Sequence, residues 1–143
     1  MGLTMSIKLR QVPPRLAAGA FFLNSGLEKL SADEETAVKV HGFASGAYPF
    51  LGKLKATDFT KILAVSEIAI GAMLVIPVVP GIVAGAALTA FAGGTVGLYA
   101  RTPGLRQPGS LRPTENGIPI AKDSWLLGIG LGLIIDDIID DLI

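Results

Sequence analysis

Long apolar stretches alternate with polar segments along the chain, and four of them resemble membrane-spanning helices. The predicted helices cover about residues 14–30, 60–79, 81–100 and 123–142. About 20 apolar residues are needed to cross a 30 Å hydrocarbon core, and the first three stretches approach that length. Pro14 suits the first turn of a helix, while Pro77 and Pro80 predict a tight reversal between the second and third helices. The pattern predicts an all-α, four-helix membrane bundle that forms a single domain over residues 1–143.

The fourth predicted helix has the shortest apolar run. The apolar residues that precede Asp136 cover only about half a bilayer at roughly 1.5 Å per residue. Either the other helices shield this helix, or Lys122 and Asp123 reach the interface, or the bilayer thins around it. We interpret it as a fourth span.

The segment between the first two spans, residues 31–59, is more than a polar connector. Its SADEET stretch indicates the start of a surface helix, with Ser31 or Asp33 as the N-cap and acidic residues in the first turn. Aromatic residues, glycines and lysines follow. This mixture predicts an interfacial or re-entrant segment that packs back on the bundle.

Small residues recur at every fourth position in the third and fourth predicted helices. Stripes of small residues let helix backbones approach closely, which favours association where lipid provides no hydrophobic driving force. We therefore expect helix packing along the following positions: Gly81, Gly85, Thr89, Gly93, Gly97, Gly128 and Gly132.

Composition supports a multi-pass protein of the cell membrane. Half of the residues are hydrophobic, the mean hydropathy is +0.58, and charged residues make up 17% of the chain, against roughly 25% in soluble domains. The formal net charge of zero gives no indication of nucleic-acid binding. The chain has no cysteine and one histidine, His41, which excludes disulfides, thiolate metal sites and bis-histidine haem ligation. No metal site is predicted.

Glu67 lies inside the second apolar stretch and is the first candidate for a functional residue. A charge at mid-membrane costs about 2.5–3.5 kcal/mol on insertion scales, so it usually has a partner. The end of the first helix supplies the candidates, which are Asn24, Glu28 and Lys29. We favour a structural ion pair between Lys29 and Glu67. In the alternative, two carboxylates share a proton or bind the head of a lipid-soluble ligand such as a quinone.

Arginines recur along the loop between the third and fourth spans, at Arg101, Arg106 and Arg112. We expect them to contact lipid phosphates or an acidic partner protein.

The chain ends in DDIIDDLI, with acidic residues at Asp136, Asp137, Asp140 and Asp141. Negative charge at a helix C-terminus opposes the macrodipole, so these residues do not stabilise their own helix. They either solvate the helix end, or dock a basic partner, or bind a cation loosely.

The first two predicted helices contain Arg15, Gly19, Phe22, Gly26, Lys29, Glu67 and Gly71. In this pattern the chain resembles the DoxX/DoxD-like membrane proteins. The segment ARTPGLRQPGSLRPTENGIPIAKDSWLLGIGLGL, followed by Asp136 and Asp137, is similar to actinobacterial members. The resemblance implies a four-helix membrane bundle. It also implies a link to quinone-coupled thiosulfate oxidation or to oxidative-stress complexes, in which a partner carries the recognisable chemistry.

Three functions remain open from the sequence. The first is an accessory or scaffold subunit of a larger membrane complex, without catalytic residues or a cofactor of its own, that contacts lipid, other membrane proteins or further copies of itself. The second is a redox subunit that binds quinone near Glu67. The third, a proton or small-solute transporter, has less support because the third helix offers only Thr89 and Thr95 as polar residues.

Overall fold

The structure is a computed structural model that describes residues 8–102, 104–110, 112–115 and 117–142. Among these residues all regular elements are helices, and one isolated bridge joins Arg106 and Pro113. The elements are η1 (Leu9–Gln11), α1 (Val12–Leu30), α2 (Glu34–Ala47), η2 (Pro49–Lys53), α3 (Ala56–Val75), α4 (Gly81–Arg101), α5 (Ile118–Ala121) and α6 (Asp123–Leu142). The predicted all-α class is confirmed.

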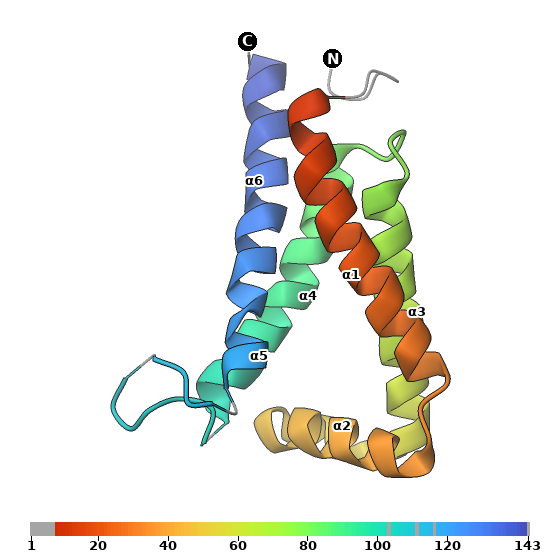
Figure 1. Cartoon of the computed structure of the whole chain (residues 1–143), viewed down its shortest axis with the longest axis vertical. Helices are drawn as coiled ribbons and strands as arrows, with labels where there is room; N and C mark the ends of the chain where they lie inside the picture. The colour runs from red at the N-terminus through yellow and green to blue at the C-terminus, as the bar shows by residue number, and fades with distance from the viewer. Residues whose placement is uncertain (1–7, 103, 111, 116, 143) are drawn as a thin grey trace.

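The four long helices run along the long axis of the molecule, and α2 crosses one end (Figure 1). The start of α1, the turn between α3 and α4, and the end of α6 lie together at the opposite end. We call this the termini end, and we call the other the α2 end. The most extensive contacts join α1 to α3 and α4 to α6, whereas the two pairs touch each other much less.

The α1–α3 pair packs through matching faces with the same residue spacing. Residues separated alternately by four and three positions lie on one side of a helix. On α1 these are Arg15, Gly19, Phe22, Gly26 and Lys29, and on α3 they are Thr60, Ala64, Glu67, Gly71 and Leu74. A Cβ added at Gly71 would lie 2.9 Å from the Gly19 carbonyl oxygen. Glycine is therefore required where these two backbones meet.

The predicted stripe of small residues on α4 does not form one interface, which corrects the sequence analysis. Positions four apart turn by about 40° per step on a helix of 3.6 residues per turn, so the stripe winds around α4. Gly81 meets the Gln11 side chain, Gly85 meets α6, and Gly97 meets Tyr48, the C-cap residue of α2, while Gly93 faces open space.

On α6 the packing glycine is Gly130, and not the predicted Gly128 and Gly132. A Cβ at Gly85 would lie 2.7 Å from the Gly130 carbonyl oxygen, and a Cβ at Gly130 would lie 2.5 Å from the Thr89 hydroxyl oxygen. Cβ atoms at Gly128 and Gly132 would meet nothing within 4 Å. Thr89 and Gly85 thus pack as predicted, against a different glycine.

Helix α3 begins and ends about four residues earlier than its predicted range of 60–79. Its last residue is Val75, and the C-cap residue Ile76 is extended (φ −76°, ψ 113°). Ile76 precedes Pro77, and the residue before a proline is disfavoured in the helical region. The reversal into α4 therefore starts before the proline.

Helix α2 begins where the acidic stretch of residues 31–59 predicts a surface helix. Asp33 is the N-cap, since its carboxylate accepts a hydrogen bond from the Thr36 backbone N–H at 2.8 Å. This bond lowers the pKa of Asp33 below its usual value. At its other end α2 is anchored to α4, because the Tyr48 hydroxyl donates to the Gly94 carbonyl at 2.7 Å. The segment packs back on the long helices as expected.

Two helical stretches in the described part of the chain are long and apolar enough to cross a membrane. They are Gly81–Arg101 and Ile118–Leu142. Helices α1 and α3 are of similar length, but each carries three charged residues: Arg15, Glu28 and Lys29 on α1, and Asp58, Lys61 and Glu67 on α3. A charge near mid-membrane is costly unless a partner neutralises it. The partners of these charges therefore determine whether α1 and α3 could also span.

Candidate functional site

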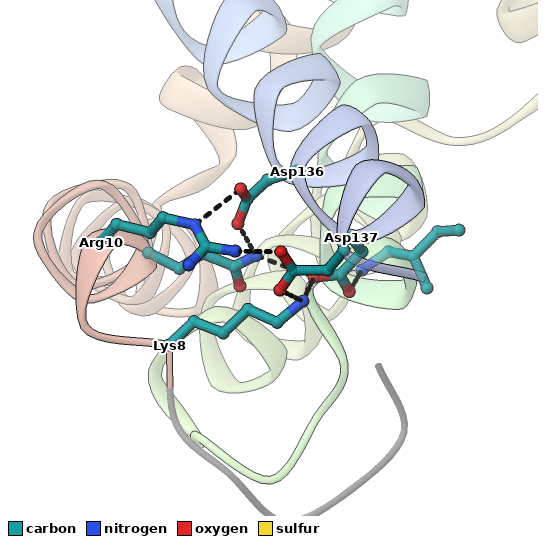
Figure 2. Close-up of polar contacts among 7 residues, drawn as sticks. Lys8, Arg10, Asp136 and Asp137 are labelled. Atoms are coloured by element: carbon teal, nitrogen blue, oxygen red, sulfur yellow. Dashed lines mark hydrogen bonds and ion pairs between the residues drawn. The ribbon is translucent and has the colours of Figure 1, made fainter. Parts of the chain in front are cut away.

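A cluster of six polar side chains joins the two ends of the described chain, and we call it the terminal cluster. Its members are Lys8, Arg10 and Gln11 near the start of α1, and Asp136, Asp137 and Asp140 near the end of α6. Figure 2 shows the side chains of Lys8 and Arg10 directed toward Asp136 and Asp137. Lys8 Nζ lies 2.9 Å from Asp140 Oδ2, and Arg10 Nη2 lies 2.6 Å from Asp140 Oδ1. Residues 8–11 are therefore held to α6 by ion pairs and hydrogen bonds.

Asp137 is the central residue of the terminal cluster and is only 2% exposed. Its Oδ1 accepts hydrogen bonds from Lys8 Nζ at 2.6 Å and from Gln11 Nε2 at 2.8 Å. Its Oδ2 accepts one from the backbone N–H of Ile82, at 2.7 Å. The first N–H groups of a helix lack partners within it, and a negative charge there matches the macrodipole. A residue near the C-terminus of α6 thus caps the N-terminus of α4.

Arg15 has the complementary role at the C-terminus of α3. Its Nε donates to the Leu74 carbonyl at 2.8 Å, and its Nη2 donates to the carbonyls of Met73 and Ile76 at 2.8 and 3.0 Å. A cation at a helix C-terminus is favourable, and these carbonyls have no partners within the helix. The reversal between α3 and α4 is therefore held by a cation on one side and by the Asp137 anion on the other.

These contacts change the interpretation of the acidic C-terminal sequence. Asp136, Asp137 and Asp140 face basic residues of the same chain, and Asp137 also caps a different helix from the one that carries it. Burial lowers the pKa of Lys8, but its hydrogen bonds to Asp137 and Asp140 raise that pKa overall. The hydrogen bond to Asp136 likewise raises the pKa of Arg10. Asp141 is exposed at the end of α6.

The predicted ion pair between Lys29 and Glu67 is present, with Lys29 Nζ 3.0 Å from Glu67 Oε1. Glu67 is 4% exposed, and its Oε1 also accepts a hydrogen bond from the Ser25 hydroxyl at 2.7 Å. Lys29 Nζ donates to the same hydroxyl at 2.7 Å. We call these three residues the Glu67 site. The ion pair neutralises the one buried carboxylate of α3 with a cation of α1.

The other two predicted members of this site lie elsewhere. Asn24 and Glu28 are exposed, and the Asn24 amide donates to the Glu28 carboxylate at 3.3 Å. Ser25 takes their place, because the row formed by Ser25 and Lys29 is rotated by about 100° from the row of Asn24 and Glu28 and faces α3. Its position four residues before Lys29 was the signal in the sequence that would have identified it.

Asp123, at the start of α6, is a further polar residue near the Glu67 site that the sequence analysis did not single out. Its carboxylate lies beside the Thr95 hydroxyl of α4 and within electrostatic range of Glu67 and Lys29. Residues of all four long helices thus contribute to this region. In the described part of the chain, no three acidic or histidine side chains are grouped as a metal site would require.

The three arginines that we expected to contact lipid headgroups or a partner protein have different neighbours in the structure. Arg101 lies over the Tyr48 ring, 5.0 Å from its centroid, and Arg106 Nη1 donates to the Ser110 carbonyl at 3.0 Å. Arg112 is exposed. Arg101 therefore contacts the residue that follows α2, and Arg106 helps to fix the loop. Contact with phosphates or with a partner protein stays a prediction for all three.

Comparison with known proteins gives no match: no family model, no curated protein and no solved structure is similar to this chain. The resemblance to DoxX/DoxD-like proteins therefore stays a prediction that rests on the residues of α1, α3 and the loop before α6.

Proposed function

We propose that the chain is a small membrane protein in which α1, α3, α4 and α6 all cross the bilayer. The observation that carries this proposal is the exposure of large apolar side chains on all four long helices. Examples are Phe21, Leu27, Ile62, Val65, Val83, Leu131 and Ile135. The ion pair of the Glu67 site and the backbone contacts of Arg15 satisfy buried charges of α1 and α3, which lowers the cost of placing them in lipid. Helix α2 and the described residues of the loop after α4 would then lie at one membrane surface.

Within the membrane we propose the role of an accessory or scaffold subunit, as DoxX/DoxD-like proteins have. Gly93, Gly128 and Gly132 support this role, since a Cβ at each would meet open space. Small residues on an exposed helix face allow a second helix to approach closely. These positions could therefore pack against another membrane protein or a second copy of this chain.

Membrane topology is tested by single cysteines, because the native chain has none. We would introduce Glu35→Cys in α2, Gln107→Cys in the loop and Leu142→Cys at the end of α6, and label each with an impermeant reagent in intact and opened cells. The four-span arrangement places Glu35 and Gln107 on one side and Leu142 on the other. If only α4 and α6 crossed, Glu35 would be labelled from the side of Leu142, and that result would exclude the proposal.

The subunit role is tested by gentle purification from the native membrane and mass spectrometry of the proteins that are retained. Partner chains in fixed stoichiometry are the expected result. Two results together would contradict this role. The first is a wild-type chain that is recovered without partners. The second is that the Gly128→Leu and Gly132→Leu variants have the same membrane yield and the same assembly size as the wild type.

A second candidate function is the binding of a quinone or a proton at the Glu67 site. The approach of Asp123 to Glu67 and Lys29 favours it, because one lysine cannot neutralise two carboxylates in a site of low dielectric. A quinone extracted from the purified wild-type protein, and lost from Glu67→Gln, would support this function. Its equal recovery from both proteins would contradict it.

A further inference from the structure

A pocket of about 240 Å³ lies at the termini end, between the start of α1, the α3–α4 reversal and the end of α6. Leu16, Val75 and Val78 form part of its apolar wall, and its charged lining consists of Lys8, Arg15 and Asp137. Leu16 and Val78 are 48% and 52% exposed, so the apolar side opens to the molecular surface. The pocket is therefore polar at one side and apolar at its mouth.

Arg15 is the group in this pocket best suited to bind an anion. It is only 7% exposed, and its side chain donates to three backbone carbonyls at the C-terminus of α3. No carboxylate within the described residues forms an ion pair with it. Asp137 is within electrostatic range, but Lys8, Gln11 and Ile82 already donate to its two oxygens. A buried cation without an ion pair favours an anion at the adjoining cavity.

We propose that this pocket binds an anionic amphiphile, with a carboxylate or phosphate head at Arg15 and Lys8 and an apolar chain that leaves between Leu16 and Val78. A guanidinium and an ammonium are suited to such heads, since hydrogen bonds between two charged groups are the strongest available. A volume of about 240 Å³ accommodates a head and the first carbons of a chain, but not a whole lipid. The remaining carbons would lie along the exposed apolar surface of α1.

The charge requirement is tested with dodecanoate and its methyl ester, which share one chain and differ in the head. Each is added to the full chain in a nonionic detergent, and the melting temperature is measured as a function of concentration. We expect dodecanoate to raise the melting temperature until its effect saturates. The ester should need about tenfold higher concentration for the same effect, because it lacks one charge-assisted hydrogen bond. Equal effects of acid and ester would overturn the proposal.

The location is tested with a variant that fills the mouth and leaves the charged residues in place. Val78→Trp is expected to abolish the saturable response to dodecanoate. The control Val65→Trp, at a valine of α3 that is similarly exposed but away from the pocket, is expected to retain it. Arg15→Gln would be less informative alone, because Arg15 also caps α3. A full response in Val78→Trp would exclude this pocket as the site.

The source of the anion is tested in bilayer discs with equal amounts of phosphatidylglycerol and phosphatidylcholine, by native mass spectrometry. Retention of phosphatidylglycerol that Val78→Trp loses indicates a phospholipid, and retention of dodecanoate alone indicates a fatty acid. Binding of neither, or stabilisation by inorganic phosphate alone without any effect of a chain, contradicts an amphiphile. Only the phospholipid arm rests on the proposed membrane location, because the detergent experiment needs no bilayer.

Discussion

The two ends of the molecule neutralise their charges in different ways. At the termini end, Asp137 receives two hydrogen bonds from residues 8–11 and one from α4, and Arg15 contacts three carbonyls at the end of α3. Toward the α2 end, Glu67 forms one ion pair with Lys29 and accepts one hydrogen bond from the Ser25 hydroxyl, and both residues belong to α1. The first arrangement fixes several helices to one another, whereas the second joins a single pair. We therefore interpret the contacts of Asp137 as structural, and we expect ligands at the adjoining pocket beside Arg15 or at the Glu67 site.

The largest expected effect is that of Asp137→Ala. Loss of this carboxylate leaves Lys8, Gln11 and the α4 N-terminus without their shared acceptor, and breaking a buried pair from one side costs about 3–5 kcal/mol. Reversible denaturation in detergent micelles measures the free energy of unfolding. The control is Asp58→Ala, which removes an exposed acid from the first turn of α3 and should cost below about 1 kcal/mol. Similar losses in the two variants would show that the terminal cluster does not hold the helices together.

At the Glu67 site we expect a smaller loss that depends on its partner. Glu67→Gln keeps the shape but removes the charge, and it should destabilise the chain by about 1–3 kcal/mol because Lys29 then lacks its counter-ion. Lys29→Met combined with Glu67→Gln should cost about 1 kcal/mol less than the sum of the single changes. The exposed pair of Asn24 and Glu28 provides the control cycle, with coupling expected within about 0.5 kcal/mol. Additive losses at Lys29 and Glu67 would mean that the ion pair contributes nothing.

The attachment of α2 to α4 should contribute less to stability than either charged site. Substitutions at two glycines of α4 test this contribution. A Cβ at Gly97 overlaps the Tyr48 hydroxyl, whereas a Cβ at Gly93 meets open space. Both changes to alanine gain helix propensity, but only Gly97→Ala disturbs the hydrogen bond from Tyr48 to Gly94. The two variants should therefore differ by about 1 kcal/mol in unfolding free energy. Faster amide exchange in α2 of Gly97→Ala, with α1 and α3 unchanged, would locate the effect, and identical exchange in both variants would contradict it.

The sequence predicts the local and pairwise features of this molecule better than its long-range ones. Helix positions follow from apolar runs and prolines, and the pair of Lys29 and Glu67 follows from the expectation that consecutive spans lie antiparallel. The terminal cluster could not be predicted in this way, since it joins Lys8 to Asp137 across 129 positions of the chain. Charge complementarity between the two ends was visible, but only the packing of α1 beside α6 brings them together.

The glycines show a second limit of pattern reasoning. A spacing of four residues identifies small side chains but not the partner that each one meets, because the stripe turns around the helix as it advances. Gly130, which packs against Gly85 and Thr89, falls between the two glycines that the spacing selects. Asp123 shows the same limit, since its neighbours belong to other helices. Which residues gather in a site is therefore decided by helix rotation, and one sequence does not determine it.

The smallest expected effect is a difference between the two ends of the molecule in how the melting temperature depends on pH above about pH 10 when a lysine is replaced by arginine. The pKa of Lys8 is raised, so its contribution to stability is fully present below its unfolded pKa of about 10.4 and is lost as the pH rises through the higher folded value. Lys8→Arg keeps its charge beyond about pH 12, and its melting temperature should fall less steeply than that of the wild type above about pH 10. At neutral pH the two proteins should melt within a few degrees of each other.

Lys61→Arg, on α3 toward the α2 end, is the matched control and should follow the wild-type profile, because no ion pair of Lys61 is formed among the described residues. Parallel profiles for Lys8→Arg and the wild type would show that the Lys8 ion pairs do not stabilise the termini end.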